Sequence, residues 1–309
     1  MKVLLATDGS TQSTTALRAA SRLLRRDSAE FDLLCVAPEF YSPKGKAGKD
    51  AKKSARMVKA YRDQIQVEAR ERLIHAQAML ATLGVEAGIR VEVGSPARVI
   101  TQLAVEYDIT VVGAHDQYTR SKPGLGPIAS RVVAAVPGAV LVGRELSETS
   151  KQWRILAAVD GSFAAEEALD LMASSLQINE AEITLMHVVE TPWVHLGLDR
   201  EWFDYPQEVT DLGGSTAGRT FKDELQREAD IVVEIARRQL ERLGLSATTV
   251  ITEGDPALEI LSEAEKGDYD LIVIGATGET DLKHNLLGSV STKVAQAALC
   301  SVLVVKFIE

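Results

Sequence analysis

The chain carries one pattern of sequence twice, and this internal repeat restricts the fold more than any other feature. KVLLATDGS at residues 2–10 matches RILAAVDGS at residues 154–162, and GSPARVITQLAVEYDITVVGA from Gly94 matches GDPALEILSEAEKGDYDLIVIGA from Gly254. The period of about 150 residues is the size of a domain, so the repeat predicts a tandem duplication and not a solenoid. We expect two domains, residues 1–147 (the first half) and 152–309 (the second half), which meet in the polar stretch GRELSETSKQW.

Within each copy, short apolar runs alternate with longer segments of helical periodicity. In the second half the runs are RILAAV, EITLMHVV, ATTVIT, DLIVIG and SVLVVK, which lack strict alternation, as expected of strands covered on both faces. Helices are expected between them, at residues 164–176, 221–243, 257–265 and 286–299. The first half repeats the scheme, with strands near Val3, Leu33, Val91, Val111 and Val140. The pattern predicts an α/β fold, two tandem doubly wound domains with five-stranded parallel sheets.

Sheets of this kind bind ligands beyond the carboxyl ends of their strands. In the second half, the loops after the first, second and fourth strands begin at Asp160, Val189 and Gly275. Asp160 is followed by Gly161 and Ser162 before a predicted helix, and these residues fit two interpretations. They can cap the helix, because Asp and Ser accept hydrogen bonds from its first N–H groups, or they can contact a ligand. The copy of DGS in the first half fits both.

The loop GATGETDLKHNLLGSVST at residues 275–292 is more specific. Gly275, Gly278 and Gly288 let backbone N–H groups approach an anion that side chains would keep away. A helix that begins near Leu287 adds the positive end of its dipole, and the Ser289 hydroxyl can donate to a phosphate oxygen. The alternative is an ordinary strand-to-helix loop whose glycines serve only turns.

The spacing of these residues resembles that of tandem universal stress proteins. Members of the ATP-binding branch of that family carry G-x2-G-x9-G-[ST] after the fourth strand, and this chain has Gly275, Gly278, Gly288 and Ser289 at those places. The likeness covers both halves nearly end to end, including the Asp at the end of the first strand and the closing CSVLVVK. It implies a Rossmann-like fold similar to that of the adenine nucleotide alpha hydrolases.

The resemblance also implies ATP as the ligand, with an accompanying Mg²⁺ left open. By motif position, the adenine would lie against Asp160 and the backbone of Val188. The ribose and phosphates would lie over Gly275, Gly278, Gly288, Ser289, Val290 and Ser291.

The first half departs from this motif. Gly113 and Gly126 keep their places, but Asp116 replaces the middle glycine and Pro127 replaces the Ser or Thr. Asp116 would place a carboxylate near phosphate oxygens of like charge. Pro127 removes a hydroxyl and a backbone N–H donor. We therefore expect a single nucleotide site, in the second half.

Charge and apolar content limit the partners. A net charge of −10 argues against sequence-independent binding to nucleic acid, which draws on a positive surface. No apolar run approaches the ~20 residues that span a bilayer, so we expect no membrane segment and a cytoplasmic protein. In proteins that this one resembles, domains pair through their last strands. AVLVG and SVLVV could do so within this chain as an internal pseudo-dimer, with a homodimer left open.

No catalytic or metal site is expected from residue order. The five histidines lack zinc spacing, and His187, inside a predicted strand, is interpreted as a packed core residue. The chain has no Walker lysine and no evident water-activating base, so we expect no enzyme, or at most a slow ATPase.

Two segments outside the motif leave their interpretation open. The basic run at residues 44–62 is a contact for an anionic partner or, as we favour, a solvated loop leading into an exposed helix face. An insertion after the second strand of the second half suggests a lid, a docking patch or a self-packed loop, and its aromatic residues are Trp193, Trp202, Phe203 and Tyr205.

The preferred function is an ATP-binding stress-response regulator. The first alternative is a module that binds a protein or another small ligand without nucleotide. The second is an adenylyl-transferring enzyme of the same fold.

Overall fold

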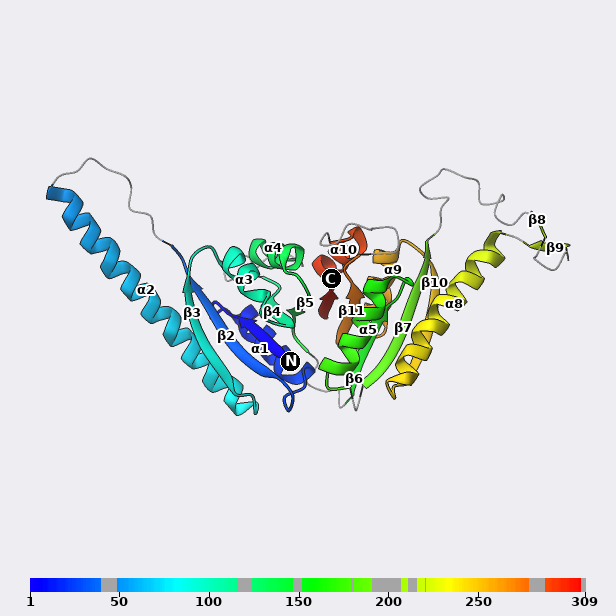
Figure 1. Cartoon of the computed structure of the whole chain (residues 1–309), viewed down its shortest axis with the longest axis horizontal. Helices are drawn as coiled ribbons and strands as arrows, with labels where there is room; N and C mark the ends of the chain where they lie inside the picture. The colour runs from blue at the N-terminus through cyan, green and yellow to red at the C-terminus, as the bar shows by residue number, and fades with distance from the viewer. Residues whose placement is uncertain are drawn as a thin grey trace.

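A computed structural model describes residues 1–39, 49–115, 124–146, 152–178, 181–190, 207–210, 216–219, 221–277 and 287–306. The two halves lie side by side, with the long helices α2 (Lys49–Thr82) and α8 (Phe221–Arg242) toward opposite ends of the molecule (Figure 1). No helix in the described ranges combines the length and apolarity that a membrane span requires.

The first half alternates strands and helices. Besides α2, its elements are β1 (Lys2–Ala6), α1 (Thr11–Leu23), β2 (Glu30–Ala37), β3 (Ala87–Val93), α3 (Pro96–Ala104), β4 (Ile109–Gly113), α4 (Pro127–Ala135) and β5 (Ala139–Gly143). The basic run lies partly in α2, where Lys59 and Arg62 are exposed, in line with the solvated-helix interpretation.

The second half repeats this order and adds a small hairpin. Besides α8, its elements are β6 (Trp153–Ala158), α5 (Phe163–Ser175), β7 (Ala181–Glu190), β8 (Gln207–Thr210), β9 (Thr216–Arg219), β10 (Ala247–Gly254), α9 (Pro256–Lys266), β11 (Leu271–Gly275), α10 (Ser289–Ala297) and β12 (Ser301–Val305). The hairpin β8–β9 lies within the insertion and was not expected, and the four aromatic residues named above lie outside the described residues. Helix α10 begins at Ser289, later than the expected start near Leu287.

The predicted α/β fold is confirmed. Within each half the five core strands are parallel, in the orders β3-β2-β1-β4-β5 and β10-β7-β6-β11-β12. Alternate strand residues enter two hydrophobic clusters, one on each face: the cluster that holds Val3 and Leu5 also holds residues of α1, α2, α5 and α8, whereas the cluster that holds Leu4 and Ala6 holds residues of α3, α4, α9 and α10. Helices on both faces explain why the strands read as continuous apolar runs.

The last strands of the two halves join the sheets. β12 pairs antiparallel with β5, Leu303 opposite Leu141, and the result is one ten-stranded sheet. This is the pairing expected of AVLVG and SVLVV within one chain. A second contact joins the ends of α1 and α5, where the Arg25 side chain donates to the carbonyl oxygens of Leu176 and Ala173. The two halves therefore share a seam that is hydrogen-bonded at two places.

Two cations, the half-buried Arg144 and the buried Lys306, each reach across this seam to a helix of the other half. Arg144, just after β5, donates to the carbonyl oxygen of Ala295 near the end of α10, at 2.7 Å. Lys306, just after β12, donates to the carbonyl oxygen of Ala134 near the end of α4, at 2.6 Å. Each interaction places a positive charge at the negative end of a helix dipole. Burial lowers the pKa of Arg144 to about 10 and the pKa of Lys306 to about 8.

Candidate functional site

A cavity of about 460 Å³ lies in the second half, where β6, β7 and β11 end. This is the edge at which open α/β sheets bind ligands. Seven of the eight predicted site residues line the cavity: Asp160, Val188, Gly275, Gly288, Ser289, Val290 and Ser291. The eighth, Gly278, lies outside the described residues. The structure thus brings the turn after β6, the end of β7 and the segment from the end of β11 to the start of α10 to one cavity.

Asp160 both supports a helix start and reaches the cavity. Its Oδ1 accepts a hydrogen bond from the backbone N–H of Ser162 at 3.0 Å. Ser162 is the N-cap of α5, and its hydroxyl accepts from the N–H of Ala165 at 3.2 Å. The capping interpretation of DGS therefore holds for Ser162, while the side of Asp160 that faces the cavity remains available to a ligand.

The end of β7 forms another wall. The ladder between β6 and β7 stops at the pair Ala158 and Met186, so Val188 lies beyond the last paired residue on that side. His187 Nδ1 lies 2.8 Å from the carbonyl oxygen of Val159, the first residue after β6. The expectation that His187 is a packed core residue is wrong: the side chain is half-buried and lines the cavity. The early end of β6 is the physical reason, and periodicity within β7 gives no sign of it.

The glycines of the motif have packing roles that their spacing does not indicate. A Cβ at Gly275 would lie 2.8 Å from the carbonyl carbon of Ala164, so glycine lets α5 approach the end of β11. Gly113 does the same in the first half, where a Cβ would lie 2.9 Å from the backbone of Gln12. The N–H of Gly288 donates to the carbonyl oxygen of Ala276 at 2.6 Å. Gly288 therefore shapes the loop and does not offer its own N–H to an anion.

Anion donors are concentrated in the first turn of α10. Ser289, Val290 and Ser291 are its first three residues, and their N–H groups donate to no acceptor in the described parts of the chain. Orphan N–H groups at a helix start, with the positive end of the helix dipole, form an anion site. The Ser289 side chain is exposed at the cavity.

The hydroxyl of Ser291 has a different role from that of Ser289. It donates within the loop, lying 2.7 Å from the carbonyl oxygen of Ala276 and 3.1 Å from that of Gly288. Ser291 is 2% exposed, so its side chain holds the loop and its N–H is the group left for a ligand.

The electrostatics of the cavity are uneven. Asp160, Glu190 and Glu228 bring carboxylates to its lining, whereas no Lys or Arg lines it among the described residues. Lys293, one turn further along α10, is paired with Asp255 at 3.2 Å. Within the described ranges, no three His, Cys, Asp or Glu side chains are grouped closely enough to hold a metal ion. Attraction for an anion on this side therefore rests on the start of α10.

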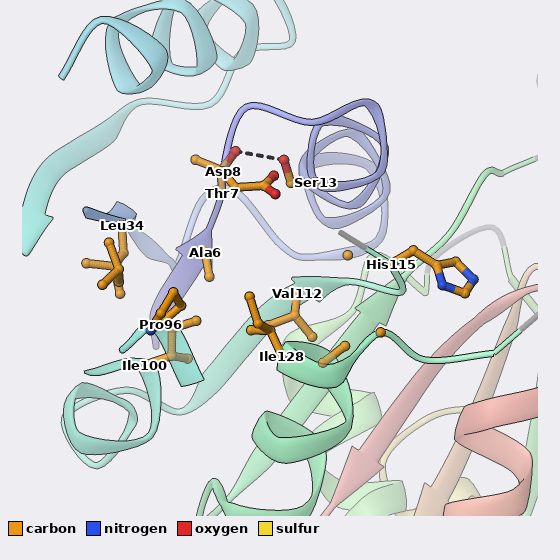
Figure 2. Close-up of a pocket in the computed structure, with 14 residues that line it drawn as sticks. Ala6, Thr7, Asp8, Ser13, Leu34, Pro96, Ile100, Val112, His115 and Ile128 are labelled. Carbon is orange, nitrogen blue, oxygen red and sulfur yellow. Dashed lines mark hydrogen bonds between the residues drawn. The ribbon is translucent and has the colours of Figure 1, made fainter. Parts of the chain in front are cut away.

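The equivalent cavity of the first half is smaller and more apolar. It measures about 90 Å³ and lies between the ends of β1, β2 and β4 (Figure 2). Helix α4 begins at Pro127, which has no N–H group, where α10 has Ser289. The other predicted departure, Asp116, lies outside the described residues. The two halves therefore differ in cavity size, which the sequence did not predict, and in the first residue of the helix beside the cavity.

Comparison with known proteins supplies the family. The model of the universal stress protein family matches residues 1–144 and again residues 153–306. The chain belongs to the universal stress protein family. Universal stress protein YxiE of Bacillus subtilis is 31% identical over 153 residues, which are 50% of this chain and 98% of that protein. A universal stress protein of Mycolicibacterium smegmatis is 25% identical and covers 98% of this chain and 96% of its own length.

Solved structures agree on the architecture. The crystal structure of a universal stress protein from Archaeoglobus fulgidus aligns with a TM-score of 0.64 at 19% identity, over 99% of this chain and 98% of that one. A likeness at this identity establishes the fold. The tandem arrangement of universal stress protein domains is thus found in sequence and in structure.

Proposed function

We propose that the second half of this tandem universal stress protein binds ATP and that the protein acts as a nucleotide-dependent stress-response regulator. The observation that carries the proposal is the cavity of about 460 Å³ that joins Asp160 and Val188 to three orphan N–H groups of α10. Apolar walls at one end and anion donors at the other match a ligand with a flat base and a phosphate chain.

Each group of residues has its own part in the proposed site. The carboxylate of Asp160 accepts from an N–H of the base, and Met186, Pro256 and Ile260 provide an apolar surface against which the base packs. The N–H groups of Ser289, Val290 and Ser291 and the hydroxyl of Ser289 donate to phosphate oxygens. No described Lys or Arg lines the cavity. Mg²⁺ bound to the triphosphate therefore offsets the negative charge of the phosphates.

We propose no rapid chemistry at this site. The donors of α10 hold phosphates as a binding site does, and the described lining provides no cation to stabilise a transferring phosphoryl group. Nucleotide occupancy then acts by changing the shape or the partner choice of the protein, which is at most a slow ATPase.

Mass spectrometry of the denatured, freshly purified protein is the direct test. Co-purified ATP, with one binding event in isothermal titration, supports the proposal. Another ligand or none, with no heat on adding MgATP, favours a module that works without nucleotide. Steady release of AMP and pyrophosphate from ATP indicates the adenylyl-transferring alternative.

The role of Mg²⁺ is tested separately. Titration of ATP in EDTA instead of magnesium is expected to weaken binding by about tenfold, because no cation then offsets the triphosphate charge at a cavity that no described Lys or Arg lines. Equal affinity in the two buffers would contradict the part assigned to the cation.

A further inference from the structure

Helix α2 is longer than its counterpart in the second half, with 34 residues against 22 in α8. Among the described side chains, the first buried one is Ala69 on α2, which begins at Lys49, and Ala229 on α8, which begins at Phe221. The additional length, about 18 Å of helix, therefore precedes the part of α2 that packs on the sheet. In Figure 1 the start of α2 stands away from β2 and β3.

An apolar stripe runs along the exposed side of α2. Its positions follow spacings of three and four residues in turn, which is the heptad pattern through which helices pair. The stripe has two polar members, Gln64 and Glu71, and all its positions are exposed. Its apolar members are Met57, Ala60, Val67, Ile74, Ala78 and Ala81. In a single copy of the chain this α2 stripe has no cover within the described residues, and Met57 and Val67 are 65% and 58% exposed.

The carboxyl-terminal half of the α2 stripe borders an acidic groove. This groove measures about 860 Å³ and lies beside α2, where β2 and β3 begin. The stripe residues that line it are Ile74, Ala78 and Ala81. Its charged lining residues all carry carboxylates: Glu30, Asp32 and Glu86. An occupant that complements this groove combines apolar side chains with positive charge.

The amino-terminal end of the same helix carries that combination. The basic run at residues 44–62 contains eight basic residues and one acidic residue. Lys59 and Arg62 of this run are exposed on α2, and Met57 of the stripe lies among them in the chain. The two ends of α2 are thus complementary to each other. Because a single helix cannot fold back on itself, they can meet only between two copies.

We propose that the α2 stripe pairs with the α2 stripe of a second copy of this chain in antiparallel orientation. This orientation places the basic end of each helix at the acidic groove of the other, so one two-fold arrangement satisfies both ends. Parallel pairing would set basic run against basic run. Gln64 and Glu71 interrupt the stripe, and polar residues at such positions set the register of paired helices at a cost in stability.

This dimer is separate from the features already described. β5 and β12 are paired within the chain, so the seam between the halves is not used again. No residue of α2 lines the cavity of the second half, so the inference does not depend on ATP binding.

Sedimentation velocity of the full chain is the first test. We expect the fraction of dimer to rise with protein concentration and to fall when NaCl is raised, because salt screens the attraction between exposed charges. A chain that stays monomeric up to its limit of solubility would overturn the proposal. Retention of that monomer on a heparin column would then assign the basic run to a polyanionic partner.

Matched substitutions on the two long helices test the surface. Val67→Glu with Ile74→Glu places carboxylates in the helix–helix interface, and we expect the dimer to weaken by about tenfold or more. Ile231→Glu with Ile235→Glu makes the same change on α8, where these side chains are 58% and 50% exposed, and should leave the dimer unchanged. Glu forms helix better than Val or Ile, so both helices should persist, which circular dichroism checks. Equal weakening by both pairs, or none by the first, contradicts the assignment.

An exchange of charge tests the antiparallel orientation. Glu30→Lys with Glu86→Lys makes the groove basic, and Lys59→Glu with Arg62→Glu makes the end of the helix acidic. Each variant alone brings like charges together at both contacts of its dimer, and we expect about tenfold weaker association. An equimolar mixture brings opposite charges together at both contacts and should dimerise about as well as the wild type. A mixture that associates no better than its components would overturn the proposal.

Discussion

Helices α4 and α10 occupy equivalent places in the two halves but differ in their first residue. Each follows a glycine with nearly the same backbone, φ −65° and ψ 166° at Gly126 and φ −64° and ψ 162° at Gly288. Pro127 then begins α4 and Ser289 begins α10. Proline at this position is compatible with a helix and removes an anion donor. The two helix starts therefore have the same backbone geometry, but only α10 has an N–H and a hydroxyl at its first residue.

The glycines that end β4 and β11 are the same in the two halves and have the same packing role. Gly113 and Gly275 both admit the backbone of a neighbouring helix, α1 in the first half and α5 in the second. That requirement exists whether or not a ligand binds. A glycine kept in both halves is therefore evidence for the fold, and the residues that differ carry the information about function.

The largest expected effect comes from giving α10 the first residue of α4. Ser289→Pro removes one N–H and one hydroxyl from the proposed phosphate site, and each charge-assisted hydrogen bond contributes about 1.5–3 kcal/mol. We expect ATP affinity to fall about 100-fold or more in isothermal titration. The backbone at Gly288 already has the conformation found before Pro127, so the fold should tolerate the change.

The control for this substitution is the thermal unfolding midpoint of the protein without nucleotide. An unchanged midpoint with lost affinity assigns the effect to the donors. Wild-type affinity in folded Ser289→Pro would remove α10 from the proposed site.

The two cations at the seam provide the next comparison. An exposed lysine titrates near 10.5, and burial lowers the pKa of Lys306 to about 8. Between these values the unfolded chain binds more protons than the folded protein, so stability rises with pH across this window and gains nothing below it. Arg144, with a pKa of about 10, remains charged over most of the same window.

Substitution of Lys306 isolates this contribution. From pH 8 to pH 10 the free energy of unfolding of the wild type should rise by about 2 kcal/mol relative to Lys306→Met, measured by urea unfolding. The side chain is 6% exposed, so little solvent screening is expected. Parallel pH profiles of the two proteins would show that Lys306 has an ordinary pKa.

Much of the fold could be predicted from the sequence because its signals are local. The apolar runs predicted the ten core strands, because a strand covered on both faces is a short continuous apolar run in the sequence itself. Pro127 predicted a missing donor, because proline lacks an N–H in any environment. The motif and the family resemblance named the seven described residues that line the cavity, and these residues lie at or beyond the carboxyl ends of strands that the apolar runs had located.

What could not be predicted depends on contacts between distant segments. The role of Gly275 requires the backbone of Ala164, and the position of His187 at the cavity requires that β6 end before β7 does. Arg144 and Lys306 look like ordinary residues after a strand until the other half supplies a helix end. The use of the Gly288 N–H within its own loop likewise appears only in three dimensions.

A smaller effect separates the two donors of Ser289. Ser289→Ala removes the hydroxyl and keeps the N–H and the dipole of α10, so one of the two interactions lost in Ser289→Pro remains. We expect ATP affinity to fall about tenfold, measured by isothermal titration. Loss as large as in the proline variant would mean that the hydroxyl alone holds the phosphate, and no loss would assign the interaction to the backbone.

The smallest expected effect is that of the reverse substitution. Pro127→Ser restores the hydroxyl and the N–H at the start of α4, yet the cavity there is about 90 Å³ against about 460 Å³ in the second half. Because donors cannot bind a nucleotide that the cavity does not admit, we expect isothermal titration to detect one ATP site in the variant, as in the wild type. A second site of comparable affinity would show that the first residue of the helix, and not cavity volume, decides which half binds.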